Sequence, residues 1–168
     1  RRLNRAKYAK QKIKVFKPII DSRFKKDFVF SHDKNQIESK SVSKSSDIKI
    51  KAKGYDVIGI DEAQFFDNGI VKICNDLANE GIRVIVAGLD MDYKGNPFGP
   101  MPNLMAIAEY VTKLHAICAK SGNLANHSHR ISNDKSLVHL GQKESYMPLS
   151  RVEFQKLIQK NKYTKEKP

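Results

Sequence analysis

Two short apolar runs, each ending at an acidic residue, constrain the fold of this chain more than any other feature. Residues 57–60 (Val-Ile-Gly-Ile) stop at Asp61, and residues 84–89 stop at Asp90. An unbroken apolar run of this length is typical of a strand in a parallel sheet, because such strands are covered on both faces. We therefore expect two buried strands of one parallel sheet.

The segment between these runs has the spacing of a helix. Between residues 70 and 78 apolar side chains recur at intervals of three and four, and Gly81 follows at the position of a C-terminal stop. Strand, helix and strand in this order predict a βαβ unit with a right-handed crossover. The fold class that follows is α/β, with a parallel core sheet.

The rest of the chain supplies further elements and a change of character near residue 118. We expect a helix-like start, short strands, a flexible connection rich in lysine and serine with one helical turn, and a terminal helix that begins at a capping-box pattern. These elements are a helix at residues 1–12, strands at 13–16 and 114–118, the connection at 33–53, a short helix at 104–110, a long loop at 120–143 and the helix from 150. The predicted organisation is a core at residues 1–117, followed by a loop and helix at 118–168.

The formal net charge of +13 is high but unevenly placed. Residues 54–117, which hold the two apolar runs, contain nine acidic and four basic residues, whereas the basic excess lies in residues 1–53 and 118–168. A phosphate-rich small substrate fits this distribution at least as well as a nucleic-acid polymer. A solvated, lysine-rich surface without a partner is the alternative.

Length and composition indicate one ordinary domain, since the chain has 168 residues and 40% hydrophobic content. No apolar run approaches the roughly 20 residues that cross a bilayer, and no charged-then-apolar leader opens the chain. We therefore expect a soluble, cytoplasmic protein. Cys74 and Cys118 are the only cysteines, and we expect both to stay reduced.

The adjacent acids Asp61 and Glu62 are the first candidates for chemistry. Open α/β sheets bind ligands at the carboxyl ends of their strands, which is where this pair lies. In phosphate-transferring folds an acid at this edge holds Mg²⁺ through water, so Asp61 is the candidate. Glu62 points to the other side of the strand and would act as a base on an acceptor hydroxyl. The alternative is that both acids are solvated turn residues.

Several separated motifs occur in the order found in one enzyme family. They are KVFKPIIDSRF at residues 14–24, SHD at 31–33, DEAQFF at 61–66, VIVAGLDMDYKGNPFGPMPNL at 84–104, AEYVTKLHAIC at 108–118 and ESY at 144–146. With these motifs the chain resembles the type II, or cellular, thymidine kinases over most of residues 1–146. The resemblance implies a P-loop-kinase-like parallel sheet flanked by helices, plus a small C-terminal lasso region.

The resemblance implies that the enzyme transfers the γ-phosphoryl group of ATP, with Mg²⁺, to the 5′-hydroxyl of thymidine or deoxyuridine. Glu62 would be the general base and Asp61 would position Mg²⁺ through water. Arg23 would stabilise charge near the transferred phosphoryl group, because a guanidinium stays charged and matches phosphate oxygens, and Asp21 would help frame the site. A homotetramer, feedback inhibition by thymidine triphosphate and a role in nucleotide salvage for DNA synthesis are also implied.

A pocket for the thymine base is implied as well. Aromatic planes suit a flat base, because burial and stacking add together. Phe65 and Tyr146 would lie against the ring, and the pocket around it would be shaped by Leu89, Tyr93 and Phe98. For each of these side chains, ordinary core packing is the alternative.

A lasso segment near residues 137–141 resembles the loop whose backbone groups bind the edges of the base in the family. Val138 and Gly141 are its candidate contacts, and Ser128 matches a position near the deoxyribose. The lasso is several residues shorter here than in the relatives it resembles.

Two features depart from the family pattern, and the first is the phosphate loop. A kinase of this class needs GxxxxGK[ST], and no such string occurs in the 168 residues. Family members place it just before the helix whose tail resembles residues 1–12. We expect that the chain is truncated at its N-terminus, and that it is inactive as it stands.

The second departure is zinc. The family commonly holds one structural Zn²⁺ with two CxxC-like pairs, whereas here the pairs read Cys-Ala-Lys-Ser at residues 118–121 and Ser-Arg-Val-Glu at 150–153. Cys118 is the one remaining thiolate ligand of four, so zinc is not expected. His127, His129 and His139 are the alternative ligands, and the capping box would replace the metal by anchoring the terminal helix.

Two other functions compete with this interpretation. A nucleic-acid-dependent ATPase is suggested by the DEAQ run and the basic charge, but such enzymes need longer chains with later motifs that are absent here. A degenerate kinase fold kept for binding or scaffolding is suggested by the missing loop and thiolates. We expect neither a membrane nor a nucleic acid as a partner.

Overall fold

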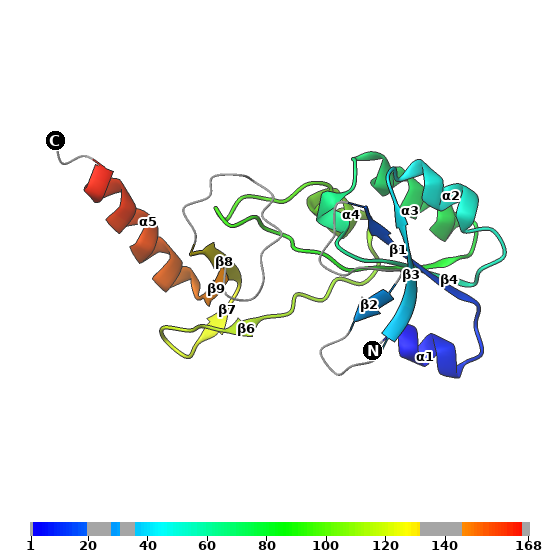
Figure 1. The fold of residues 1–168 in the computed structure, drawn as a ribbon, viewed down its shortest axis with the longest axis horizontal. Helices are drawn as coiled ribbons and strands as arrows, with labels where there is room; N and C mark the ends of the chain where they lie inside the picture. Colours follow the sequence, from blue (N-terminus) through cyan, green and yellow to red (C-terminus); the bar gives the residue numbers. More distant parts are fainter. Residues whose placement is uncertain (1, 20–27, 31–35, 132–145, 166–168) are drawn as a thin grey trace. The chain divides into compact units, whose positions relative to one another are not determined.

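The computed structural model describes residues 2–19, 28–30, 36–131 and 146–165 (Figure 1). By their internal contacts they form two compact units. The first comprises Arg1–Asp90 and Pro97–Glu109, and the second comprises Met91–Asn96 and Tyr110–Pro168.

The first unit contains a five-stranded sheet with the order β2-β3-β1-β4-β5. Its strands are β1 (Ile13–Pro18), β2 (Phe28–Phe30), β3 (Gln36–Val42), β4 (Val57–Ile60) and β5 (Arg83–Val86). Four of them, β3, β1, β4 and β5, run parallel, and β2 pairs antiparallel with β3 at the edge. The predicted α/β class with a parallel sheet is confirmed.

Helices cover both faces of this sheet (Figure 1). One face carries α2 (Ser46–Lys51), α3 (Gly69–Asn79) and α4 (Met101–Ile107), and the other carries α1 (Arg2–Tyr8), which contacts β1 and β4. A short 3-10 turn, η1 (Ala63–Phe65), follows β4. The sheet therefore has helices on both faces, and the apolar run of β4 is buried along its whole length.

The core of the first unit is formed where β1 and β4 meet α3. Phe16, Ile58 and Ile60 are fully or almost fully buried, and they belong to the same cluster as Ile70 and Leu77 of α3. Burying a side chain of this size contributes about 1.5–3 kcal/mol. Because this cluster sits directly behind the end of β4, it gives the acids that follow the strand a rigid support.

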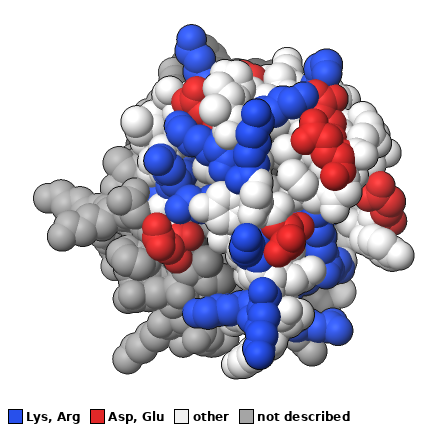
Figure 2. Space-filling view, turned by 90° about the vertical axis from the view of Figure 1, so that its right-hand side faces the viewer, with Lys and Arg blue, Asp and Glu red and all other residues white. Residues whose placement is uncertain are grey.

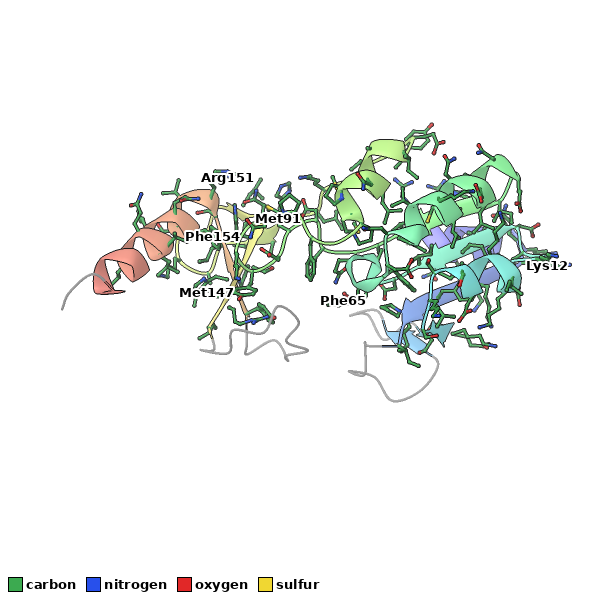
Figure 3. The ribbon with its side chains drawn as sticks, turned by 90° about the horizontal axis from the view of Figure 1, so that it is seen from above. Lys12, Phe65, Met91, Met147, Arg151 and Phe154 are labelled. Atoms are coloured by element: carbon green, nitrogen blue, oxygen red, sulfur yellow. The ribbon has the colours of Figure 1, made fainter. Side chains whose placement is uncertain are left out.

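The second unit contains two small antiparallel sheets and a terminal helix. β6 (Ala116–Ile117) pairs with β7 (Leu124–Ala125), β8 (His127–Arg130) pairs with β9 (Tyr146–Leu149), and α5 spans Arg151–Lys165. Its core consists of Cys118, Ala125, Leu149 and Phe154, with Met147 packed against it; Figure 3 labels Met147 and Phe154. The Ser150 hydroxyl accepts the Glu153 N–H at 3.4 Å, so the predicted cap of the terminal helix is confirmed.

Several sequence-based element predictions differ from the structure. The buried strand predicted at residues 84–89 is β5, which ends at Val86 and is only partly buried, because the chain leaves the sheet there to form the loop that carries Leu89. The long loop predicted at 120–143 contains β7 and β8, whose pairing with β6 and β9 outweighs their polar surroundings.

The flexible connection predicted at residues 33–53 instead contains β3 and α2, because β3 is held between β1 and β2 and pairing outweighs its polar composition. The short helix lies at Met101–Ile107 rather than 104–110, and it starts directly after Pro100, which precedes its first turn. The strand predicted at 114–118 is limited to β6, because β7 offers only two residues for pairing.

Charged side chains on the face shown in Figure 2 are interspersed, with acidic groups lying among lysines and arginines. On the surface of the first unit, Lys49 Nζ lies 2.8 Å from Asp76 Oδ2 and 3.8 Å from Glu80 Oε1, and Lys72 Nζ lies 2.8 Å from Asp76 Oδ2. These pairs favour the solvated-surface interpretation of the charge. Among the described residues, no helix has the length and apolar character that a bilayer span requires.

Candidate functional site

The end of β4 delivers Asp61 and Glu62 to the carboxyl edge of the sheet. Asp61 N–H donates to Phe16 O of the neighbouring strand at 2.9 Å, and Glu62 N–H donates to the Asp61 side-chain Oδ1 at 3.0 Å. One residue later, Ala63 N–H donates to Ala87 O at 3.0 Å, just beyond the end of β5. Backbone hydrogen bonds from both neighbouring strands thus fix the loop that carries the two acids.

Glu62 has a left-handed backbone, with φ 51° and ψ 43°. A residue with a Cβ pays about 1–3 kcal/mol for such a conformation, which persists only where its surroundings hold it. The bonds on either side of Glu62 supply that restraint. Strain of this kind concentrates at functional sites, so the backbone as well as the residue type makes Glu62 a candidate.

Gln64 lies between the end of β4 and the loop after β5. Its side chain is buried, its Nε2 donates to Glu62 Oε2 at 2.6 Å, and its Oε1 accepts the Leu89 N–H at 3.0 Å. Leu89 itself is half-exposed, at 49%. The candidate base and a predicted pocket residue are therefore joined through one amide.

Phe65 and Phe98 form an aromatic pair beside these acids. Their ring centroids are 5.5 Å apart and their planes are at 88°, an edge-to-face arrangement, and Phe65 is labelled in Figure 3. Phe98 N–H donates to Asp90 O at 3.0 Å, which holds its loop against the end of β5. Three predicted pocket residues of the first unit, Phe65, Leu89 and Phe98, thus surround the loop that carries Glu62.

In the second unit, Arg130 joins the two predicted pocket tyrosines. Its guanidinium carbon lies 4.0 Å from the centre of the Tyr93 ring and 5.4 Å from that of Tyr146, and its Nη2 donates to the Tyr146 hydroxyl at 2.8 Å. Arg130 and Tyr146 are direct partners across β8 and β9. The strand pairing and the buried cation together fix the two rings.

The turn that carries Tyr93 is held by Asp92. The Asp92 Oδ1 accepts the N–H groups of Lys94 at 2.8 Å and Asn96 at 2.9 Å, and its own N–H donates to Asn96 O at 2.8 Å. These bonds to Asp92 explain why the six-residue segment Met91–Asn96 can hold the Tyr93 ring rigidly.

Side chains alternate along β8. Ser128, the predicted deoxyribose contact, shares one strand face with Arg130, whereas His127 and His129 belong to the other. His127 stacks on Phe154 with ring centroids 4.4 Å apart, and His129 meets the same ring edge-on at 6.3 Å. Burial and, secondly, the charge of Lys120 lower the pKa of His129. Both histidines therefore have packing roles.

The Cys118 thiol is buried in the core of the second unit. Burial raises its pKa, but hydrogen bonds from the Ser121 hydroxyl and from the backbone N–H groups of Ser150, Lys120 and Ser121 outweigh burial and bring the pKa down to about 6. Within the ranges that the structure describes, no group of three or more His, Cys, Asp or Glu converges as a metal site would require. The expectation that zinc is absent stays a prediction.

Comparison with known proteins decides the family. The family model described as thymidine kinase matches residues 1–154. A thymidine kinase of Bacteroides fragilis is 52% identical over 163 residues, covering 96% of this chain and 81% of that protein. A thymidine kinase of Bacteroides thetaiotaomicron is 55% identical over 152 residues, covering 90% and 76%, and one of Porphyromonas gingivalis is 50% identical over 156 residues, covering 93% and 76%.

The chain belongs to the thymidine kinase family. The recognition made from the motifs is confirmed, and so are the α/β fold class and the prediction of an enzyme with thymidine kinase function.

The predicted site residues of this thymidine kinase fall into three groups. Those in the first unit are Asp61, Glu62, Phe65, Leu89 and Phe98, and those in the second are Tyr93, Ser128 and Tyr146. Asp21, Arg23, Val138 and Gly141 lie outside the described residues. In the first unit Phe65 contacts Phe98, and Leu89 is linked to Glu62 through Gln64. In the second, Arg130 contacts both Tyr93 and Tyr146.

Two residues that contact the candidate site residues were not predicted. Gln64 lies inside the DEAQFF run, and its place two residues after Glu62 was the available signal. Arg130 shares a strand face with Ser128, so the period of two along a strand would have pointed to it. In both cases the missing information was the partner, which comes from a distant part of the chain.

Proposed function

We propose that this thymidine kinase family member transfers the γ-phosphoryl group of ATP to the 5′-hydroxyl of thymidine or deoxyuridine, giving the nucleoside monophosphate and ADP. The observation that carries the proposal is the loop after β4, where Glu62 is held in a left-handed conformation at the carboxyl edge of a parallel sheet. Open α/β sheets bind their ligands at this edge.

Glu62 is the proposed general base. A carboxylate that takes the proton of the attacking hydroxyl contributes typically about 10²–10⁴-fold to the rate. Asp21 and Arg23, named from the family resemblance, would frame the site and stabilise charge on the transferred group.

Mg²⁺ is the proposed metal, and Asp61 is the residue that would hold it. No cluster of three potential ligands occurs in the described parts of the chain, so an all-protein cage is not available there. Mg²⁺ commonly binds one or two carboxylates, often keeps several waters and takes its other ligands from substrate phosphates, so Asp61 alone fits. When bound, the ion neutralises charge on the phosphates.

The nucleoside contacts are assigned unit by unit. In the first unit we assign Phe65, Leu89 and Phe98 to the thymine base, supported by their grouping around the Glu62 loop. In the second unit we assign the base to Tyr93 and Tyr146, supported by their shared contact with Arg130. The family resemblance adds Ser128, Val138 and Gly141.

The wider properties of the family complete the proposal. They are a homotetramer, feedback inhibition by thymidine triphosphate, a cytoplasmic location and a role in nucleotide salvage for DNA synthesis. We also propose that residues 1–117 form the nucleoside kinase core and that residues 118–168 form the lasso and terminal helix.

The experiment measures phosphorylation of radiolabelled thymidine. Because the 168 residues contain no GxxxxGK[ST] string, the phosphate-loop segment of a thymidine kinase is joined ahead of Arg1, and the unextended chain serves as the inactive reference. Glu62→Gln should then lower kcat by about 10²–10⁴-fold. Glu80→Gln, at an exposed carboxylate after α3, is the matched control and should leave kcat unchanged.

Two results would oppose the proposal. Full activity of Glu62→Gln would remove its role as the base. An extended chain that binds thymidine but never phosphorylates it would favour the second candidate, a degenerate kinase fold kept for binding, which the missing thiolates suggest.

A further inference from the structure

Gln64 is a buried polar residue that the proposed mechanism does not use. It is 3% exposed, it lies two residues after Glu62 in η1, and both ends of its amide are bonded. The Nε2 bond to Glu62 Oε2 is 2.6 Å and the Oε1 bond from Leu89 N–H is 3.0 Å. A side chain with two buried partners from different loops is well placed to fix one relative to the other.

The orientation of this amide follows from the chemistry of its partners. A backbone N–H can only donate, so Leu89 requires Oε1 to face it. The Nε2 group must then face Glu62, and an ionised carboxylate can only accept. The reversed amide would set two donors against each other and an acceptor against a carboxylate, so the hydrogen-bond network assigns a single orientation.

Two glycines lie against Gln64. A Cβ on Gly88 would lie 2.7 Å from Gln64 Oε1, and a Cβ on Gly99, whose φ is +51°, would lie 2.3 Å from the Gln64 backbone O. At Gly99 the contact is with backbone and φ is positive, so this position requires glycine, whereas a Cβ at Gly88 would displace the end of the Gln64 side chain. The absence of a side chain at Gly88 therefore leaves room for the Gln64 amide, and its absence at Gly99 lets the two backbones approach.

We infer that Gln64 is a positioning residue for Glu62, holding its carboxylate in the orientation from which it takes the hydroxyl proton. The inference rests on the proposed function of Glu62. Gln64 also accepts the Leu89 N–H and so connects the Glu62 carboxylate to the loop after β5. The distance and orientation of the base relative to Leu89, a proposed contact of the thymine base, are thereby fixed. A misplacement of about 1 Å in such a group can lower the rate by about 10²-fold.

A double-mutant cycle in the loop-extended chain tests the inference. Gln64→Met keeps the length of the side chain and removes both hydrogen bonds, and it should lower kcat by about 10–100-fold while the KM for thymidine changes by less than about threefold. In the Glu62→Gln background, the same substitution should change kcat by less than about threefold, because the carboxylate it positions is gone. Gln155→Met, at an exposed position of α5, is the matched control.

A second variant separates the two halves of the bridge. Gln64→Glu, assayed at pH 8, keeps an acceptor for Leu89 N–H but sets a carboxylate against Glu62, and it should lower kcat at least as much as Gln64→Met. In the 168-residue chain, the Leu89 amide proton should move upfield and exchange faster with solvent in Gln64→Met than in Gln64→Glu. This NMR readout does not depend on activity.

The outcomes distinguish the two proposals. If Glu62→Gln keeps full activity, the proposed base is wrong and the inference falls with it. If Glu62→Gln lowers kcat as expected but Gln64→Met is harmless, or lowers kcat by the same factor in both backgrounds, Glu62 stands and Gln64 has only a structural role. An unchanged Leu89 amide in Gln64→Met would also overturn the inference.

Discussion

Arg130 illustrates how single residues organise the second unit. Its side chain is 5% exposed, yet its charge is accommodated by the face of Tyr93 and by the hydroxyl of Tyr146. A planar guanidinium can stack on one ring and donate to another group at the same time, whereas the compact ammonium of lysine cannot. The two tyrosines therefore depend on an arginine at this position.

Substitution of this residue should weaken nucleoside binding. Arg130→Lys keeps the charge but loses the stacking and the directed bond, which together should raise the Kd for thymidine about tenfold, or about 1.4 kcal/mol. Isothermal titration calorimetry measures this directly. Tyr146→Phe, which removes only the hydroxyl, should have a smaller effect, and Arg151→Lys, at an exposed position of α5, should have none. An unchanged Kd in Arg130→Lys would show that the tyrosines do not contact thymidine.

Among the helices and strands, hydrophobic periodicity predicted those whose structure depends on their own local sequence. β4 has the bounds given by its apolar run, and the acids at its end lie at the sheet edge because the chain can only turn there. β3 was missed because its polar sequence becomes a strand only through pairing with β1 and β2. The same holds within the site: Glu62 could be predicted from its strand, but the partner of Gln64 at Leu89 lies 25 residues away and depends on the fold.

Asp67 is an example of an element-level contact between loops. Its Oδ1 accepts the Ser45 hydroxyl at 2.6 Å, and its Oδ2 accepts the Ser45 N–H at 3.0 Å, which links the start of α2 to the start of α3. The Ser45 hydroxyl is the main cause of the lowered pKa of Asp67, and the Ser45 N–H is the second. The bonds therefore favour the ionised carboxylate.

The stability that Asp67 supplies should depend on pH. Since its folded-state pKa lies below the unfolded value, its contribution is present above about pH 3.9 and is lost as the pH falls through the folded-state pKa. Asp67→Asn should lower the free energy of unfolding by about 1 kcal/mol at pH 7. This is less than is typical of a charged hydrogen bond, because Asp67 is exposed.

Urea unfolding at pH 7 and pH 3 measures this difference. The difference in free energy of unfolding between the parent chain and Asp67→Asn should be smaller at pH 3 than at pH 7. As a control, Asp47→Asn removes a 3.8 Å surface pair with Lys51 and should lower the free energy of unfolding by less than about 0.5 kcal/mol at both pH values. If the difference between the parent chain and Asp67→Asn is the same at both pH values, the charged hydrogen bonds of Asp67 are not its cause.

The second unit of the molecule is held together by a small core and by a few specific contacts. Its core is small, and the Cys118 sulfur accepts hydrogen bonds from the Ser121 hydroxyl and from the backbone N–H groups of Ser150, Lys120 and Ser121. The His127 ring and Phe154 add a stacked pair, and the Ser150 cap anchors α5. We expect these contacts to hold the unit together without a metal ion.

Chelation should therefore leave the protein intact. Treatment with EDTA should shift the Tm of the whole chain by less than about 1 °C, whereas loss of a structural zinc would cost several kcal/mol. Differential scanning calorimetry, with elemental analysis of the same sample, checks this. Stoichiometric zinc together with a large fall in Tm would contradict it and would point to ligands such as His139, outside the described residues.

The division of the chain into Arg1–Asp90 with Pro97–Glu109, and Met91–Asn96 with Tyr110–Pro168, has a practical consequence for anyone who wishes to dissect the protein. The polypeptide passes from one unit to the other three times, so no single cut separates them. A product ending at Glu109 would keep Tyr93 and Gly95 but lose Arg130 and Phe154, against which they pack. Separate expression of either half would thus separate residues 91–96 from the rest of the unit to which they belong or from the chain on either side of them. Mutagenesis of the intact chain is the better way to study each unit.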